Sequence, residues 1–137
     1  MLVSTKGRYA LRVMVELAQH ESGEYVPLKT IAAAQDISEK YLESIIVVLS
    51  KAGLLDGLRG KGGGYRLNRS AKEYTAGEIL RLTEGTLAPV ACLDCESNKC
   101  SRAPVCKTLP MWETLNDLIC NYLDSVTIEE LAKGATV

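Results

Sequence analysis

Residues 28–67 have the sequence LKTIAAAQDISEKYLESIIVVLSKAGLLDGLRGKGGGYRL, and this stretch decides the fold. Its apolar spacing predicts a short helix over residues 28–34, followed by a tight turn over residues 35–37. Ser38 is a good N-cap for a second helix, which we expect to run to about Lys51. Two helices joined by a tight turn are typical of a helix-turn-helix.

A glycine-rich hairpin follows these two helices. Residues 54–58 and 65–68 have the composition of short strands, and the basic sequence RGKGGG lies between them. A helix is expected before the pair, from about residue 5 to near residue 20, and another after the hairpin, over residues 75–83. The expected N-caps of the helices outside the pair are Ser4 or Thr5, Thr75 and Thr127. We therefore predict that residues 1–85 form a winged helix-turn-helix DNA-binding domain, mainly α with a small β-hairpin wing.

The charge of the chain is unevenly distributed. The whole chain has 137 residues and a net charge of -1. Residues 1–72 contain 11 Lys and Arg against 7 Asp and Glu, whereas residues 73–137 contain 5 against 10. A positive N-terminal half suits a nucleic-acid partner, so we expect double-stranded DNA to bind there.

The second helix of the pair carries the candidate base contacts. In a helix-turn-helix this helix lies in the major groove, and its N-terminal residues reach base edges. The candidate residues are Ser38, Lys40, Tyr41, Glu43 and Ser44. In the wing, Arg59 and Lys61 lie beside glycines that let the backbone approach the minor groove or the phosphates. The alternatives are an ordinary solvated helix face and a nucleotide-binding loop, but this glycine loop joins two strands and opens no helix.

The C-terminal half is expected to hold a loop and a helix with an apolar face. Residues 86–108 show little periodicity, which is typical of a functional loop. A helix is predicted over residues 109–123, and its spacing places four apolar residues on one line, as in a coiled-coil seam: Met111, Leu115, Leu118 and Tyr122. A second copy of the chain is the simplest partner for this face. We therefore predict a homodimer, with residues 109–137 forming a dimerisation helix and a tail that ends in a short helix over residues 127–133.

Four of the five cysteines lie in the loop, at Cys92, Cys95, Cys100 and Cys106. No apolar run is long enough to span a membrane, and basic residues interrupt the N-terminal stretch, which lacks an export cleavage motif. We therefore expect the protein in the cytoplasm, where clustered cysteines indicate metal or redox chemistry rather than structural disulfides. Four thiolates can bind an iron-sulphur cluster or zinc, and a thiol switch without metal is the alternative.

Several motifs resemble those of bacterial winged helix-turn-helix regulators of the IscR, NsrR and CymR type, the Rrf family. The motifs are STKGRYAL at residues 4–11, ISEKYLE at 37–43, RGKGGGYRL at 59–67 and TAGEILRLTEG at 75–85. The resemblance covers nearly the whole chain, and the third motif is its most specific part. It implies a homodimer that binds a partly palindromic DNA site and senses iron-sulphur status, nitric oxide, redox state or cysteine supply. It also implies that Cys92, Cys100 and Cys106 ligate a cluster, 2Fe-2S in preference to 4Fe-4S.

The cysteine spacing departs from the family pattern. Cluster-binding relatives commonly have five residues in each gap, whereas here Cys92 and Cys100 are separated by seven residues and Cys100 and Cys106 by five. The histidine ligand of IscR-like relatives is replaced by Leu109, and the N-terminal aspartate of NsrR-like relatives by Arg8. Cys95 is therefore the candidate fourth ligand, and zinc or no metal remain alternatives to the cluster.

These features together predict a transcription regulator whose DNA binding is controlled through the cysteine-rich loop, residues 86–108. This loop joins the DNA-binding domain to the dimerisation helix, so a change in its state can reorient the two recognition helices. The alternatives are a regulator of thiol redox state or cysteine metabolism without metal, and a metal-carrying or electron-transfer protein. We expect no enzyme, because no nucleophile and base are recognisable around the single histidine, His20.

Overall fold

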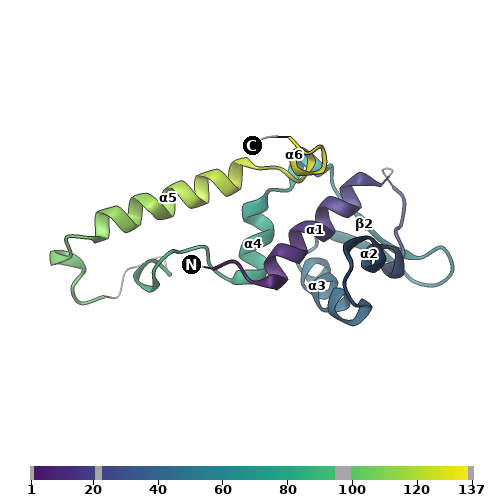
Figure 1. Ribbon diagram of the computed structural model, residues 1–137, viewed down its shortest axis with the longest axis horizontal. Coiled ribbons are helices and arrows are strands. Elements are labelled where there is room, and N and C mark those ends of the chain that lie inside the picture. The colour runs from purple at the N-terminus through teal and green to yellow at the C-terminus, as the bar shows by residue number, and fades with distance from the viewer. Residues whose placement is uncertain (1, 21–22, 95–99, 136–137) are drawn as a thin grey trace.

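The computed structural model describes residues 2–20, 23–94 and 100–135 and is shown in Figure 1. Its helices and strands follow the predicted order: α1 (Thr5–Gln19), α2 (Leu28–Gln35), α3 (Glu39–Lys51), β1 (Leu55–Leu58), β2 (Gly64–Leu67), α4 (Ala76–Glu84), α5 (Leu109–Ser125) and α6 (Ile128–Ala132). Short 3-10 turns lie at Ala71–Glu73, Ala91–Leu93 and Ala103–Val105. Among the described helices, none combines the length and apolar character needed to cross a bilayer.

Hydroxyl side chains cap the N-termini of four of the helices. The side chains of Ser4, Ser38, Thr75 and Thr127 accept hydrogen bonds from backbone N–H groups in the first turns of α1, α3, α4 and α6. Such caps satisfy N–H groups that have no partner inside the helix. At Thr127 the cap is reciprocal, because Glu130 accepts a hydrogen bond from the Thr127 backbone N–H at 2.8 Å. The predicted N-caps are therefore confirmed.

The predicted helix-turn-helix is formed by α2 and α3. The chain leaves α2 at Asp36, whose φ of 52° lies in the left-handed region that a short polar side chain tolerates. The N–H of Ile37 then donates to the carbonyl of Ala32 at 3.1 Å, which closes the turn. α3 buries one apolar stripe against the other helices: Leu42, Ile45, Ile46 and Leu49.

The wing is the antiparallel pair of β1 and β2, in which Leu55 lies opposite Leu67 and Leu58 opposite Gly64. The predicted strands, 54–58 and 65–68, differ from β1 and β2 by one residue at three of their four ends. Leu54 lies between α3 and β1 rather than in the strand, because its N–H donates back to the Leu49 carbonyl at 3.1 Å. Asn68 lies outside β2 because its N–H donates to the hydroxyl of Tyr74 at 3.0 Å.

A third segment joins the wing. Val26 and Tyr65 form an isolated bridge with two backbone hydrogen bonds, 2.8 Å from the Val26 N–H and 2.9 Å from the Tyr65 N–H. A Cβ at the neighbouring residue 64 would overlap the carbonyl of Val26, so only glycine allows this approach. The wing is therefore held against the segment that leads into α2.

The core is built around α1 and draws in residues from distant parts of the chain. Its fully buried members include Met14 of α1, Ile31 of α2, Ile79 of α4 and Ile128 of α6. Tyr74 is also buried, and its hydroxyl donates to the Leu54 carbonyl at 3.0 Å and accepts from two backbone N–H groups after β2. This hydroxyl connects the two ends of the wing. The last helix, α6, thus packs with the N-terminal helices.

α5 extends away from the unit formed by α1 to α4, as Figure 1 shows. Its base is fixed to α4, since Arg81 forms a bidentate ion pair with Asp124 at 2.6 and 2.9 Å. None of its residues is buried, and the four predicted apolar residues are open to solvent: Met111 at 54%, Leu115 at 37%, Leu118 at 63% and Tyr122 at 52%. A single copy of the chain therefore leaves the apolar face of α5 uncovered.

Candidate DNA interface and cysteine loop

The predicted base-contacting residues lie together at the N-terminal end of α3. Lys40, Glu43 and Ser44 are exposed, and Tyr41 is half-buried. Two of these five side chains also form hydrogen bonds with the backbone of α3. Ser38 accepts from the Tyr41 N–H at 3.1 Å as the cap, and the Ser44 hydroxyl donates to the Tyr41 carbonyl at 2.6 Å. Among the five predicted residues, Lys40 and Glu43 thus carry the charges, and Glu39 is exposed beside them.

Tyr41 is supported from α1, a contact that the sequence did not reveal. Its ring meets the ring of Tyr9 edge to face, with centroids 5.8 Å apart. The guanidinium of Arg12 lies 4.6 Å from the Tyr9 centroid, and Arg12 also donates to the Gln35 side chain at 2.8 Å. The N-terminal end of α3 is therefore tied to α1 and to the end of α2.

A groove of about 650 Å³ separates α3 from the wing. Val47 of α3 and Leu58 of β1 are among its lining residues, with Lys29 and Arg59. Lys61 is exposed in the loop between the strands. The structure thus places Arg59 in the groove beside α3 and Lys61 in the loop between the strands.

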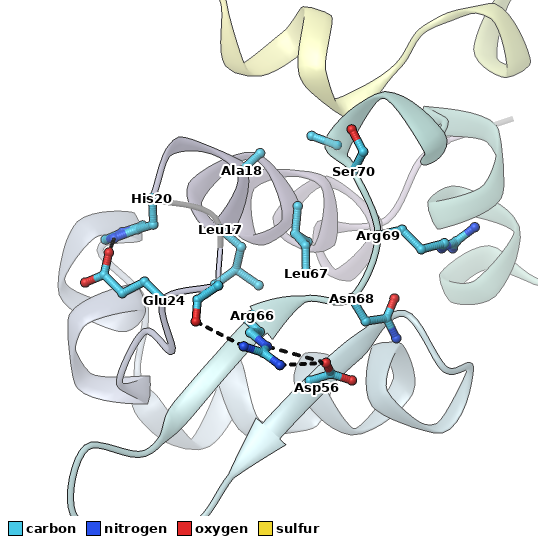
Figure 2. Close-up of a pocket in the computed structure, with 12 residues that line it drawn as sticks. Leu17, Ala18, His20, Glu24, Asp56, Arg66, Leu67, Asn68, Arg69 and Ser70 are labelled. Atoms are coloured by element: carbon cyan, nitrogen blue, oxygen red, sulfur yellow. Dashed lines mark hydrogen bonds and ion pairs between the residues drawn. The ribbon is translucent and has the colours of Figure 1, made fainter.

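The opposite face of the wing borders a second, polar pocket of about 490 Å³, shown in Figure 2. Strand residues alternate between faces, so Asp56 and Arg66 point here while Gly57 and Tyr65 line the groove beside α3. Arg66 is engaged within the fold, at 3.4 Å from Asp56 and 3.1 Å from the Gly23 carbonyl. Through these contacts, Arg66 links the wing to the segment after α1.

The cysteine loop lies between α4 and α5. Cys92 and Cys106 are half-buried and Cys100 is exposed, while Cys95 lies outside the described residues. Within residues 2–20, 23–94 and 100–135, no three His, Cys, Asp or Glu side chains are close enough together to hold a metal ion. The described cysteines therefore do not form a ready cluster site in this conformation.

Cys106 lies just before α5, in a setting that favours the thiolate. A hydrogen bond with the Thr108 side chain, 3.4 Å away, lowers the pKa of the Cys106 thiol, and bonds with the backbone of Thr108 and Leu109 act in the same direction. A lower pKa increases the reactive thiolate fraction at neutral pH.

Charged contacts connect α4 to the base of α5. The ion pair with Arg81 lowers the pKa of the Asp124 carboxyl, and the thiol of Cys120 also interacts with this guanidinium. Both partners are more than a third exposed, so the pair contributes only about 0–1 kcal/mol to stability. Its bidentate geometry nevertheless specifies how the C-terminal end of α5 contacts α4.

A family model described as "Rrf2: Iron-dependent Transcriptional regulator" matches residues 3–134. The chain belongs to the Rrf2 family. The resemblance inferred from the motifs is therefore confirmed. Among curated relatives of this family member, the HTH-type transcriptional regulator CymR of Bacillus subtilis (strain 168) is 40% identical over 132 residues, which cover 96% of this chain and 90% of CymR. The HTH-type transcriptional regulator IscR of Pectobacterium atrosepticum is 35% identical over 137 residues, which cover 100% of this chain and 82% of IscR.

The fold of this Rrf2 family member matches a solved relative over almost its whole length. The structure of CymR (YrzC), the global cysteine regulator of B. subtilis, superposes with a TM-score of 0.81 at 37% identity and covers 99% of both chains. The winged helix-turn-helix is thereby confirmed. The protein is a DNA-binding transcription regulator, and both named relatives are regulators rather than enzymes.

Proposed function

We propose that the protein is a cytoplasmic homodimer that binds double-stranded DNA through α3 and the wing and that its cysteine loop controls this binding. The observation that carries the proposal is the exposed N-terminal surface of α3 beside a basic, glycine-rich wing. Residues 1–85 contact DNA, residues 86–108 respond to a signal, and residues 109–137 contain the dimerisation helix. We assign the dimer interface to α5, because its apolar face is exposed to solvent in a single chain.

An iron-sulphur cluster bound by Cys92, Cys95, Cys100 and Cys106 is the leading signal, with 2Fe-2S ahead of 4Fe-4S. The cysteine content of the loop and the iron-dependent description of the family support it. Thiolates are the usual ligands of such clusters, and the same set can hold zinc. Because the described cysteines do not converge in this conformation, cluster binding requires the loop to rearrange.

A thiol switch without metal is the second candidate. Two observations favour it: Cys100 is exposed, and a relative that covers nearly the whole chain is named as a global cysteine regulator. In this case the oxidation state of the loop cysteines, or cysteine supply, sets the affinity for DNA.

Purification under anaerobic conditions separates these candidates. With a cluster, we expect coloured protein that contains iron and acid-labile sulphide, and we expect Cys106→Ser to lose both. Cys120→Ser is the matched control, because Cys120 lies on α5 outside the loop and should retain them. A colourless protein without iron from iron-replete cells would exclude the cluster, and zinc analysis of the same sample tests the zinc alternative.

Arg59→Ala is expected to lower affinity for a duplex selected by the wild-type chain by roughly 10-fold or more. The change removes one exposed cation from the wing of each subunit. If Arg59 binds phosphate, the slope of log affinity against log salt falls by about 1 for each phosphate that the variant no longer neutralises. Fluorescence anisotropy over a salt series measures both effects.

Lys133→Ala is the control for this measurement. It removes a positive charge at the end of α6, where Lys133 lies 3.5 Å from Glu129. An equal loss of affinity and of salt slope in both variants would show that the wing has no specific contact with DNA.

A further inference from the structure

The face of α3 that points away from the core is polar except at one position. Val47 is 47% exposed and lies among charged and hydroxyl side chains, with Lys40, Glu43 and Ser44 before it and Lys51 after it. At about 100° per residue, Val47 projects between Glu43 and Ser44. This direction is opposite to the buried stripe of Leu42, Ile45, Ile46 and Leu49. Val47 therefore lies at the centre of the surface that α3 presents to DNA.

The surroundings of Val47 show what it can bind. It lines the groove between α3 and the wing together with Leu58, which is also 47% exposed. The charged residues of the same groove are the cations Lys29 and Arg59 and one carboxylate, Glu39. Isolated apolar residues are common on protein surfaces, but here two exposed apolar side chains lie in one groove with cations suited to phosphates. This combination matches the major groove, where phosphates flank the base edges.

One base offers an apolar group in the major groove. Thymine presents its C5-methyl there, whereas the other edges present donors and acceptors that a valine side chain cannot pair. We infer that Val47 is a specificity-determining residue that selects thymine at one position of each half-site through contact with this methyl. The inference rests on the proposed placement of α3 in the major groove.

The test uses the full chain and its own selected DNA. Wild-type protein first selects duplexes from a random-sequence library, and each thymine of the selected site is then replaced by deoxyuracil, which lacks only the methyl. We expect one thymine per half-site at which the replacement lowers affinity roughly fourfold, the effect of withdrawing one methyl from contact. At the other thymines the replacement should have little effect.

Val47→Ser provides the second arm. This variant should bind the selected site about fourfold more weakly per half-site and no longer distinguish thymine from deoxyuracil at that position. Leu82→Ser is the matched control, since Leu82 is an apolar residue of α4 with 38% exposure outside the groove. This variant should lose as much affinity as the wild type when thymine is replaced by deoxyuracil.

Three results would overturn the inference. If the wild-type chain selects a site in which no thymine methyl matters, or if Val47→Ser keeps the same sensitivity, Val47 does not select thymine, while DNA recognition by α3 still stands. If the wild-type chain binds no duplex, the proposed function fails and the inference fails with it.

Discussion

Leu118→Glu is expected to convert the protein to a monomer and to lower its affinity for a two-half-site duplex by roughly 100-fold or more. Leu118 is the most exposed of the four apolar residues on its face of α5, at 63%. In a two-fold interface the new carboxylate appears on both subunits, and each loses water on association. An unpaired buried charge costs several kcal/mol, and about 3 kcal/mol already corresponds to roughly 100-fold.

Sedimentation velocity and fluorescence anisotropy measure the two effects separately. Because Leu118 is exposed in the single chain, the monomer itself should keep its helical content. Glu113→Lys is the control, since it changes the charge of the same helix on the side opposite to the apolar line, where residue 113 is exposed. A Leu118→Glu protein that remains dimeric at micromolar concentration would show that α5 does not form the interface.

The DNA-binding elements could be predicted because their signals are local. The Ser38 cap, the turn at residues 35–37 and the glycine-rich sequence of residues 59–64 each determine the conformation of a few neighbouring residues. The start of the first strand and the end of the second were wrong by one residue because the hydrogen bonds that decide them come from outside the hairpin. Leu54 bonds back to α3, and Asn68 bonds to Tyr74.

The contacts that hold these elements together are not local and could not be predicted. The pairing of Val26 with Tyr65 spans 39 positions of the sequence, and no pattern near Val26 indicates it. Capping at Thr127 predicts α6, but its packing on α1 depends on the direction in which α5 returns the chain. The cysteines are a similar case, because the sequence places them in one loop but does not determine whether their sulphur atoms meet.

Gly64→Ala is expected to release the wing from the segment before α2. Residue 64 has a φ of 152°, and a Cβ there would overlap the carbonyl of Val26. That atom belongs to the backbone and cannot rotate away, so the pairing of Val26 with Tyr65 has to open. Loss of two backbone hydrogen bonds together with the strained φ is worth about 2–4 kcal/mol of unfolding free energy. Urea unfolding measures this loss, and faster hydrogen exchange at the Val26 and Tyr65 amides locates it.

The DNA affinity of Gly64→Ala should fall by at least as much as that of Arg59→Ala. The reason is that the whole wing, and not one side chain, loses its position. Gly62→Ala separates the two causes. Gly62 also has a positive φ, 77°, but nothing lies within 4 Å of a Cβ built there, so this variant carries backbone strain without the collision. If Gly62→Ala and Gly64→Ala weaken DNA binding equally, backbone strain in the wing alone explains the loss. A loss confined to Gly64→Ala would mean that the contact with Val26 aims Arg59 and Lys61 at the DNA.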